Sequence, residues 1–461
     1  MLKDLAEIVS IESVQDTPSG KNAPFGENLR KALDWFLNKA RSYGLETGEN
    51  NGYYGWADYG DKSKPAIGIL THIDIVPVGE GWDTDPLTVT KKGDMLYGRG
   101  VSDDKGALCM ALHLLKKFKE EKREFSHRIR LIVGCNEESG CECLKKYRQD
   151  ETDIPVVSLV PDSHFPVTYC EKGIAHIEAF FRPDSDFKAN FESLVAGQRA
   201  NVVPEKAQFK LLYNGFSNGR FLSFRENFLD LAMPKKYTTQ VGFAKDDFTV
   251  ESENGASIVT VKGKSAHGST PQKGKNAVWG AWAFIAGSAP HNNFTKEMLK
   301  LCSPDADEYL GLRISDEKSG ALTMNMGITE YFGDNVKVTF DFRLPLGIDA
   351  DTVCKALESL PFCVGTNIVH RDDILFVDPN SKLVTTLMDV YKECTGDSDA
   401  RPLLSGGGTY AKTLPNALAF GISMPSAPDK AHEANEQISL SALNKTSEIY
   451  EKAIIALDKI Y

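Results

Sequence analysis

The sequence predicts an open, mostly parallel α/β sheet with helices on both faces, plus an inserted α+β domain with an antiparallel sheet. In the first third of the chain, short apolar runs alternate with amphipathic helical patterns, which is typical of parallel α/β folds. From residue 174 to residue 377, half-exposed strand patterns replace that alternation. The α/β pattern then resumes. We therefore expect a discontinuous first domain, residues 1–173 and 378–461, and an inserted domain, residues 174–377.

Three apolar runs in the first domain are short enough to be buried strands, and each is followed by acidic or imidazole side chains. They are PAIGILTH (65–72), RIRLIVGCNEE (128–138) and PVVSLVPD (155–162). Between the first two runs, residues 104–121 have apolar positions at helical spacing. Because ligands bind at the carboxyl ends of strands in open α/β sheets, the polar residues at these ends are expected to share one site.

The remaining elements fit the same division into two domains. Helices are expected at the N-terminus, over 26–43 and over 438–460, and residues 378–396 resume the α/β style. In the inserted domain, half-exposed strands are expected at 173–182, 256–265 and 334–345, and a helix at 276–287. We find no internal repeat and no low-complexity segment.

The composition limits the partners and the location of the protein. A net charge of −11 argues against nucleic acid or an anionic membrane as a partner. No apolar run approaches the roughly 18 residues of a membrane span. The charges of Lys3, Asp4 and Glu7 leave no room for a secretory signal. Nine cysteines, an odd number spread over the whole chain, fit reduced thiols in the cytoplasm.

Five residues at these strand ends and in two loops form a candidate metal-ligand set: His72, Asp103, Glu138, Asp162 and His432. Two imidazoles and three carboxylates suit two divalent cations that share one carboxylate. Glu137, beside Glu138, could act as a general base on a metal-held water. A solvated helix start is the alternative for two consecutive acids, but these two follow an apolar strand.

The motifs around these residues resemble a known enzyme family. HID (72–74), GRGVSDDKG (98–106), NEESG (136–140) and HEANE (432–436) are similar to the zinc aminopeptidase/carboxypeptidase-like amidohydrolases. GQRANVVP (197–204), GKSAHGSTP (263–271) and SGGGTYAK (405–412) are similar to the PepV-type, carnosinase-like bacterial dipeptidases. The resemblance implies a zinc-exopeptidase type of catalytic domain and an inserted lid domain that binds substrate.

The resemblance also implies roles at the metal centre. Asp103 would bridge two ions, with His72 and Asp162 on one and Glu138 and His432 on the other. Asp74 would orient the His72 imidazole, and Glu137 would be the general base. The Asp103–Asp104 peptide bond would be cis, and Asp104 would either cap the following helix or neighbour the ligands.

In the inserted domain, the resemblance makes His267 the residue that stabilises the oxyanion. Arg343, Asn201 and the backbone of Gly406, Gly407 and Gly408 would hold the C-terminal end of the substrate. Simpler alternatives stay open: His267 on the surface, Arg343 paired with Asp341, and the glycines as a linker.

Together these observations predict a cytoplasmic, monomeric dipeptidase that uses two divalent ions and cleaves short peptides with a free N-terminus. Zn²⁺ is the expected ion, with Mn²⁺ or Co²⁺ as alternatives. An N-acyl-amino-acid or succinyl-diamino-acid deacylase is the alternative enzyme. A non-catalytic metal-binding scaffold is the alternative outside enzymes, and it would have no need for Glu137.

Overall fold

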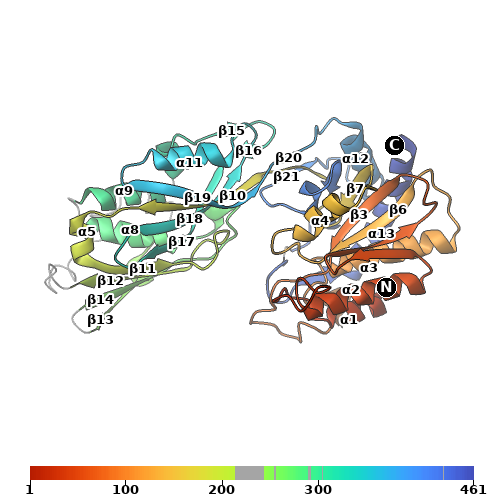
Figure 1. The fold of residues 1–461 in the computed structure, drawn as a ribbon, viewed down its shortest axis with the longest axis horizontal. Helices are drawn as coiled ribbons and strands as arrows, with labels where there is room; N and C mark the ends of the chain where they lie inside the picture. Colours follow the sequence, from red (N-terminus) through yellow and green to blue (C-terminus); the bar gives the residue numbers. More distant parts are fainter. Residues whose placement is uncertain (213–242, 254–255, 289–291, 304, 429) are drawn as a thin grey trace. The chain divides into compact units, whose positions relative to one another are not determined.

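The chain forms two compact units, shown in Figure 1. The computed structural model describes residues 1–212, 243–253, 256–288, 292–303, 305–428 and 430–461. Unit 1 comprises Met1–Glu171 and Leu375–Tyr461, and unit 2 comprises Lys172–Ile374. The expected boundaries, 173/174 and 377/378, lie a few residues after the observed divisions.

Unit 1 contains a nine-stranded mixed sheet with a parallel centre. Its order is β1 (Glu46–Asn50), β2 (Tyr54–Tyr59), β6 (Arg128–Gly134), β3 (Ala66–His72), β7 (Val157–Val160), β22 (Ala417–Ala419), β9 (Thr168–Glu171) and β20 (Leu375–Phe376), and β21 (Leu403–Ser405) also pairs with β9. Strands β6, β3, β7 and β22 run parallel, whereas β1, β2 and β20 pair antiparallel with their neighbours. Every residue of β3 and β6 is buried, which explains their continuous apolar sequences.

Helices cover both faces of this sheet. The helices of unit 1 are α1 (Leu2–Val9), α2 (Glu27–Ser42), α3 (Lys105–Glu120), α4 (Glu142–Asp150), α12 (Lys382–Thr395) and α13 (Leu440–Ile460). On β2, Tyr59 contacts Phe118 of α3, and Tyr54 contacts Tyr147 of α4. Because strand residues an odd number apart face opposite sides, α3 and α4 lie on opposite faces. The predicted α/β architecture is therefore confirmed.

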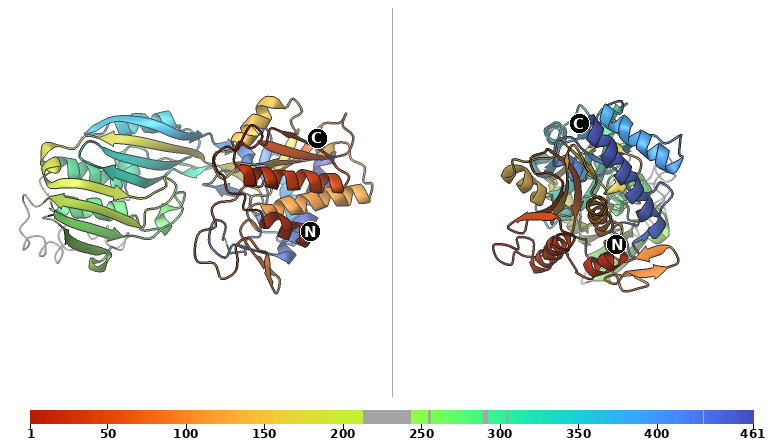
Figure 2. Two further views of the ribbon diagram at one scale, coloured as in Figure 1. Left: turned by 60° about the horizontal axis from the view of Figure 1, so that its bottom comes forward. Right: turned by 90° about the vertical axis from the view of Figure 1, so that its right-hand side faces the viewer.

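Unit 2 contains an eight-stranded sheet in which every pair is antiparallel. Its order is β13 (Phe248–Glu253), β14 (Ala256–Lys262), β12 (Lys206–Leu212), β11 (Phe191–Ala196), β17 (Thr323–Tyr331), β18 (Val336–Leu344), β10 (Gly173–Phe181) and β19 (Cys363–Asp372). The helices are α5 (Ser185–Asn190), α8 (Ala277–Ser288), α9 (Asn293–Cys302), α10 (Ala306–Tyr309) and α11 (Ala350–Glu358). Buried and exposed residues alternate along β12, as expected for a sheet that the described helices cover on one face (Figure 2).

Short elements complete the two units. In unit 1, β24 (Gln437–Ser439), β5 (Met95–Tyr97) and β4 (Thr90–Lys92) form one small sheet, and β23 (Ile422–Ser423) pairs with β8 (Ser163–His164). In unit 2, β15 (Ser315–Asp316) pairs with β16 (Gly320–Ala321). The 3-10 helices are η1 (Lys245–Asp247), η2 (Pro271–Lys273) and η3 (Tyr410–Lys412). Within the described ranges, no helix is both long enough and apolar enough to cross a membrane.

Candidate active site

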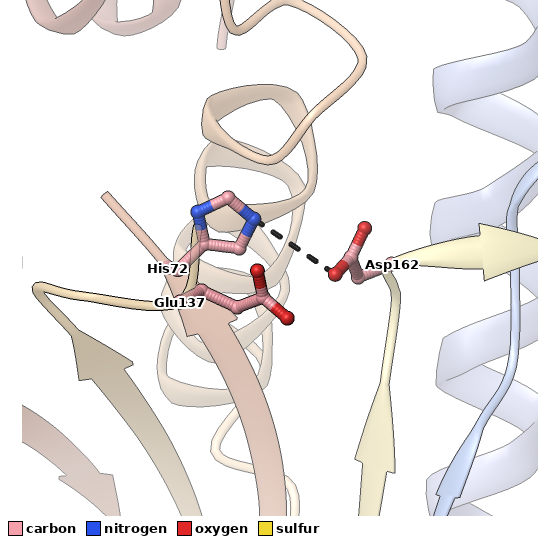
Figure 3. Close-up of side chains that lie close together, drawn as sticks. All are labelled: His72, Glu137 and Asp162. Atoms are coloured by element: carbon pink, nitrogen blue, oxygen red, sulfur yellow. Dashed lines mark ion pairs between the residues drawn. The ribbon is translucent and has the colours of Figure 1, made fainter. Parts of the chain in front are cut away.

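The topology of unit 1 brings the predicted strand-end residues to one edge of the sheet. His72 is the last residue of β3, and Gly134, its partner in the ladder, is the last residue of β6. Glu137 follows β6 and Asp162 follows β7, so both lie beyond the same ends of parallel strands. Figure 3 shows His72, Glu137 and Asp162 pointing toward one another. Single atoms of these three side chains lie within 4.8 Å of one another, a spacing that a metal ion could bridge.

Asp103 lies between two histidines. Its Oδ1 is 2.9 Å from His72 Nε2, and its Oδ2 is 3.0 Å from His432 Nε2. His72 Nε2 is also 3.8 Å from Asp162 Oδ2, and His432 Nε2 is 3.0 Å from Glu138 Oε1. The structure thus brings all five candidate ligands together, with one oxygen of Asp103 facing each histidine. Among the described residues, the two groups of side chains close enough to hold one ion are His72, Glu137 and Asp162, and His72, Asp103 and Glu138. The division of the ligands between two ions that the resemblance implied stays a prediction.

The donor set fits divalent cations chemically, because acidic groups outnumber the imidazoles in a small space. Burial raises the pKa of Asp162 well above its usual range, and the neighbouring Asp103 raises it further. Burial also raises the pKa of Glu137 well above its usual range, and the neighbouring Glu138 and Asp74 raise it further. Imidazole nitrogens and carboxylate oxygens are ordinary ligands of Zn²⁺ and similar ions, and such an ion would offset this excess of negative charge.

Asp74 supports both halves of the centre. Its backbone oxygen lies 3.0 Å from His72 Nδ1, and its carboxylate Oδ1 lies 3.4 Å from the same atom. The two carboxylate oxygens also accept hydrogen bonds of 3.0 Å from the backbone N–H groups of Glu137 and Glu138. Since Asp74 is buried, this one side chain fixes the His72 ring and the turn that carries the adjacent acids.

Glu436 is a supporting residue that the sequence analysis did not single out. It is fully buried, and its Oε1 accepts hydrogen bonds from the backbone N–H groups of Ser102 (2.9 Å) and Asp103 (3.1 Å). Its Oε2 accepts from Gly100 N–H (3.0 Å) and from Arg99 Nη1 (2.8 Å). Glu436 therefore holds the loop that presents Asp103. Its place four residues after His432 was the only signal in the sequence.

Asp104 corrects one interpretation of the sequence. The residue occupies the N-cap position of α3, and the Asp103–Asp104 peptide bond is cis, as the resemblance implied. However, its side chain makes no capping hydrogen bond. Asp104 Oδ2 instead accepts a hydrogen bond of 3.2 Å from the backbone N–H of His72. The carboxylate therefore supports a candidate ligand and does not cap the helix.

The substrate-binding candidates of unit 2 also lie near one another. Asn201 O accepts a hydrogen bond of 2.7 Å from Gly268 N–H, next to His267. A Cβ atom on Gly268 would lie 2.3 Å from Asp341 Oδ2, so only glycine allows this approach. Asp341 in turn pairs with Arg343, whose Nη2 donates to Oδ2 at 2.9 Å. The ion pair between Arg343 and Asp341, which the sequence analysis gave as an alternative, is thus present. Through Asp341 and Gly268 it connects the candidates Asn201, His267 and Arg343.

His267 and Arg343 differ in exposure. The His267 side chain is exposed, and its Nδ1 lies 2.6 Å from Ser269 Oγ. Arg343 is buried against Asp341. In unit 1, the residues Gly406, Gly407 and Gly408 form the loop between β21 and η3. The five candidate ligands and these glycines therefore belong to unit 1, and Asn201, His267 and Arg343 to unit 2.

Comparison with known proteins identifies the class of protein that this fold and site define. The chain belongs to the peptidase family M20/M25/M40, whose model matches residues 68–456. It is therefore a peptidase of a metal-dependent family.

Individual relatives are similar over the whole chain. A Staphylococcus epidermidis protein named "Putative dipeptidase" is 31% identical over 475 residues, which cover 99% of this chain and 97% of that protein. The solved structure of the di-peptidase Dug1p from Saccharomyces cerevisiae aligns with a TM-score of 0.58 at 14% identity, over 99% of this chain and 95% of that one. Human carnosine dipeptidase 1 aligns with a TM-score of 0.57 at 13% identity, over 99% and 96%. At these identities the two structures establish the shared fold.

Proposed function

We propose that this protein is a dipeptidase that hydrolyses short peptides with a free N-terminus and uses two divalent metal ions. The observation that carries the proposal is the position of Asp103, with one carboxylate oxygen facing each of two histidines. The dipeptidase names of the relatives and the half-buried Glu137 beside the candidate ligands support it.

The proposed metal ligands fall into two overlapping sets. His72, Asp103 and Asp162 would hold one ion, and Asp103, Glu138 and His432 the other. Bound divalent cations would lower the pKa of the attacking water and offset charge on the substrate carbonyl oxygen. Zn²⁺ is the proposed ion, and Mn²⁺ and Co²⁺ accept the same ligands.

Glu137 is the proposed general base. It would take a proton from the attacking water and later give it to the leaving amine, so one carboxyl would serve both steps. Burial raises its pKa, which favours a group that must carry a proton between the two steps. Asp74 would keep the Glu137 backbone and the His72 ring in place through its carboxylate Oδ1.

Unit 2 would supply the groups that recognise the substrate. We propose that His267 stabilises the developing oxyanion and that Arg343 and Asn201 hold the C-terminal end of the peptide, together with the 406–408 backbone of unit 1. Arginine is suited to a carboxylate because its guanidinium donates two parallel hydrogen bonds.

Dipeptide hydrolysis after metal replacement tests the proposal. The protein would be treated with a chelator and supplied with Zn²⁺, Mn²⁺ or Co²⁺, then assayed with free dipeptides, N-acyl amino acids and N-succinyl-diamino acids. We expect no activity without metal and higher kcat/KM for dipeptides. Higher kcat/KM for the acylated substrates would replace the dipeptidase with a deacylase, and no turnover with any metal would favour the scaffold.

We also propose that the protein is monomeric and that each chain uses its own His267. Glu137→Ala and His267→Ala proteins, each inactive, would be mixed. No recovered activity is expected, because each chain would lack one required group. Recovered activity would show that His267 acts on the centre of a second chain.

A cytoplasmic location is proposed on the state of the cysteines. None of the nine cysteines is joined in a disulfide. Reduced thiols of this kind are usual in the cytoplasm. Fractionation of cells that express the tagged protein would check this.

A further inference from the structure

The glycine loop of unit 1 is attached to a buried carboxylate. Glu171, the last residue of β9, is fully buried. Its Oε2 accepts a hydrogen bond of 3.0 Å from the Thr409 backbone N–H, and its Oε1 accepts one of 2.7 Å from the Thr409 hydroxyl. Ser405, just before the glycines, pairs with Glu171 in the β21–β9 ladder. Glu171 therefore holds the chain on both sides of the three glycines.

The loop itself has two further fixed points. Gly407 N–H donates a hydrogen bond of 2.9 Å to Ser405 Oγ. The Thr409 hydroxyl, which donates to Glu171, also accepts a hydrogen bond of 3.1 Å from Ala411 N–H. Gly408 lies between these fixed points, and within the described part of the chain its N–H has no hydrogen-bond acceptor. The orientation of the Gly408 peptide is thus set by its two neighbours.

We infer that Glu171 is a positioning residue for recognition of the substrate's terminal carboxylate. This inference rests on the proposed function, in which the 406–408 backbone binds that carboxylate. Three consecutive glycines lose much conformational entropy when the loop is ordered. The two hydrogen bonds from Thr409 to the Glu171 carboxylate offset part of that cost in free energy. Both carboxylate oxygens of Glu171 accept hydrogen bonds from Thr409, and Glu171 thereby orders the loop. In the ordered loop, Gly408 N–H is the group that donates to the substrate carboxylate.

A comparison of two substrates distinguishes a role of Glu171 in carboxylate recognition from a general role in the stability of the fold. Alanyl-alanine carries the terminal carboxylate, and alanyl-alanine amide lacks it but has the same scissile bond. In Glu171→Gln, one carboxylate oxygen is replaced by an NH₂ group that cannot accept from Thr409. We expect KM for alanyl-alanine to rise about 10-fold, as for the loss of a hydrogen bond to a charged group. We expect kcat/KM for the amide, and the metal content, to stay the same.

Threonine variants provide the matched comparison. Thr409→Val removes the hydroxyl and keeps the shape, and should give the same substrate-dependent loss, whereas Thr409→Ser should restore the wild-type ratio. Thr413→Val is the control, because the Thr413 hydroxyl donates to Tyr410 O and makes no hydrogen bond to Glu171. Equal losses on both substrates, or no change on either, would overturn the inference. If the wild-type protein cleaved neither substrate, the proposed function would fail instead.

Discussion

The half-buried Asp103 of unit 1 and the fully buried Asp341 of unit 2 are two carboxylates with opposite surroundings. Asp103 lies between two histidines, with Glu138 and Asp162 close by, so negative groups predominate. Asp341 lies between Arg343 and His176, whose Nε2 is 3.6 Å away, so groups that can be positive predominate. Burial would raise the pKa of Asp341, but His176 and Arg343 lower it.

The difference indicates a division of labour between the units. An excess of carboxylates binds cations, whereas a guanidinium held by one carboxylate suits an organic anion such as a peptide terminus. Substitutions around Asp103 should therefore change metal binding or the chemical step, and substitutions at Arg343 beside Asp341 should change substrate affinity.

The largest expected effect separates the two adjacent acids of unit 1. Glu137→Gln should lower kcat by about 10²–10⁴-fold and keep the metal, because a general base acts mainly in the transition state. Glu138→Gln should lose metal, because Glu138 is a proposed ligand beside His432. Kinetics and elemental analysis of both variants check this. Similar metal contents in the two proteins would show that these neighbours do not have separate roles.

The next effect concerns the support of Asp103. Glu436→Gln removes an acceptor from the loop at residues 99–103 and should weaken metal binding about 10–100-fold, as other changes behind metal ligands do. Competition with a chromophoric chelator measures the affinity. Glu433→Gln is the control from the same motif, since Glu433 is exposed and pairs with Lys430. Equal affinities in the two variants would contradict the supporting role.

In unit 2, Arg343→Met should raise KM for dipeptides about 10–100-fold, the range expected for a lost charged hydrogen bond, and should leave metal content unchanged. Arg371→Met is the matched control, because Arg371 is an exposed arginine on β19 of the same sheet and pairs with Asp351. Steady-state kinetics and metal analysis decide the outcome. Loss of metal in Arg343→Met would break the division between the units.

The smallest effect is on the stability of unit 1. Burial would raise the pKa of Asp4, but hydrogen bonds from Tyr43, His113 and Lys39 lower it to about 2. A lowered carboxyl pKa stabilises the fold above the ordinary value of 3.8, and this stabilisation is lost as the pH falls toward 2. Asp4→Asn should therefore cost about 1 kcal/mol at pH 7, allowing for solvent screening, and almost nothing at pH 2. Urea unfolding at both pH values measures this, and an equal difference at both would exclude the carboxylate as the cause.

Several candidate ligands of unit 1 could be predicted from the sequence, because the carboxyl ends of parallel strands lie at the same edge of a sheet. Three buried runs ending in His72, Glu137 and Asp162 must place these residues at one edge of the sheet, whatever the details of packing. Asp103 and His432 lie in loops, and only the motifs indicated them.

The supporting residues could not be predicted in the same way. The hydrogen bonds that Glu436 accepts from the Asp103 backbone and that Asp104 accepts from the His72 backbone join residues distant in sequence. In unit 2, Arg343 lies within a strand and His267 in a loop, so no rule of sheet topology connects them. Their link through Asp341 and Gly268 depends on a close backbone approach that only the folded structure reveals.

The most direct test of the central claim is the number of metal ions bound per chain in wild-type and Asp103→Ala proteins, measured by elemental analysis after dialysis against Zn²⁺. The proposed bridging role of Asp103 predicts two ions in the wild-type protein and the loss of both in the variant, together with all activity. One tightly bound ion in a fully active wild-type protein, or two ions retained by Asp103→Ala, would contradict it.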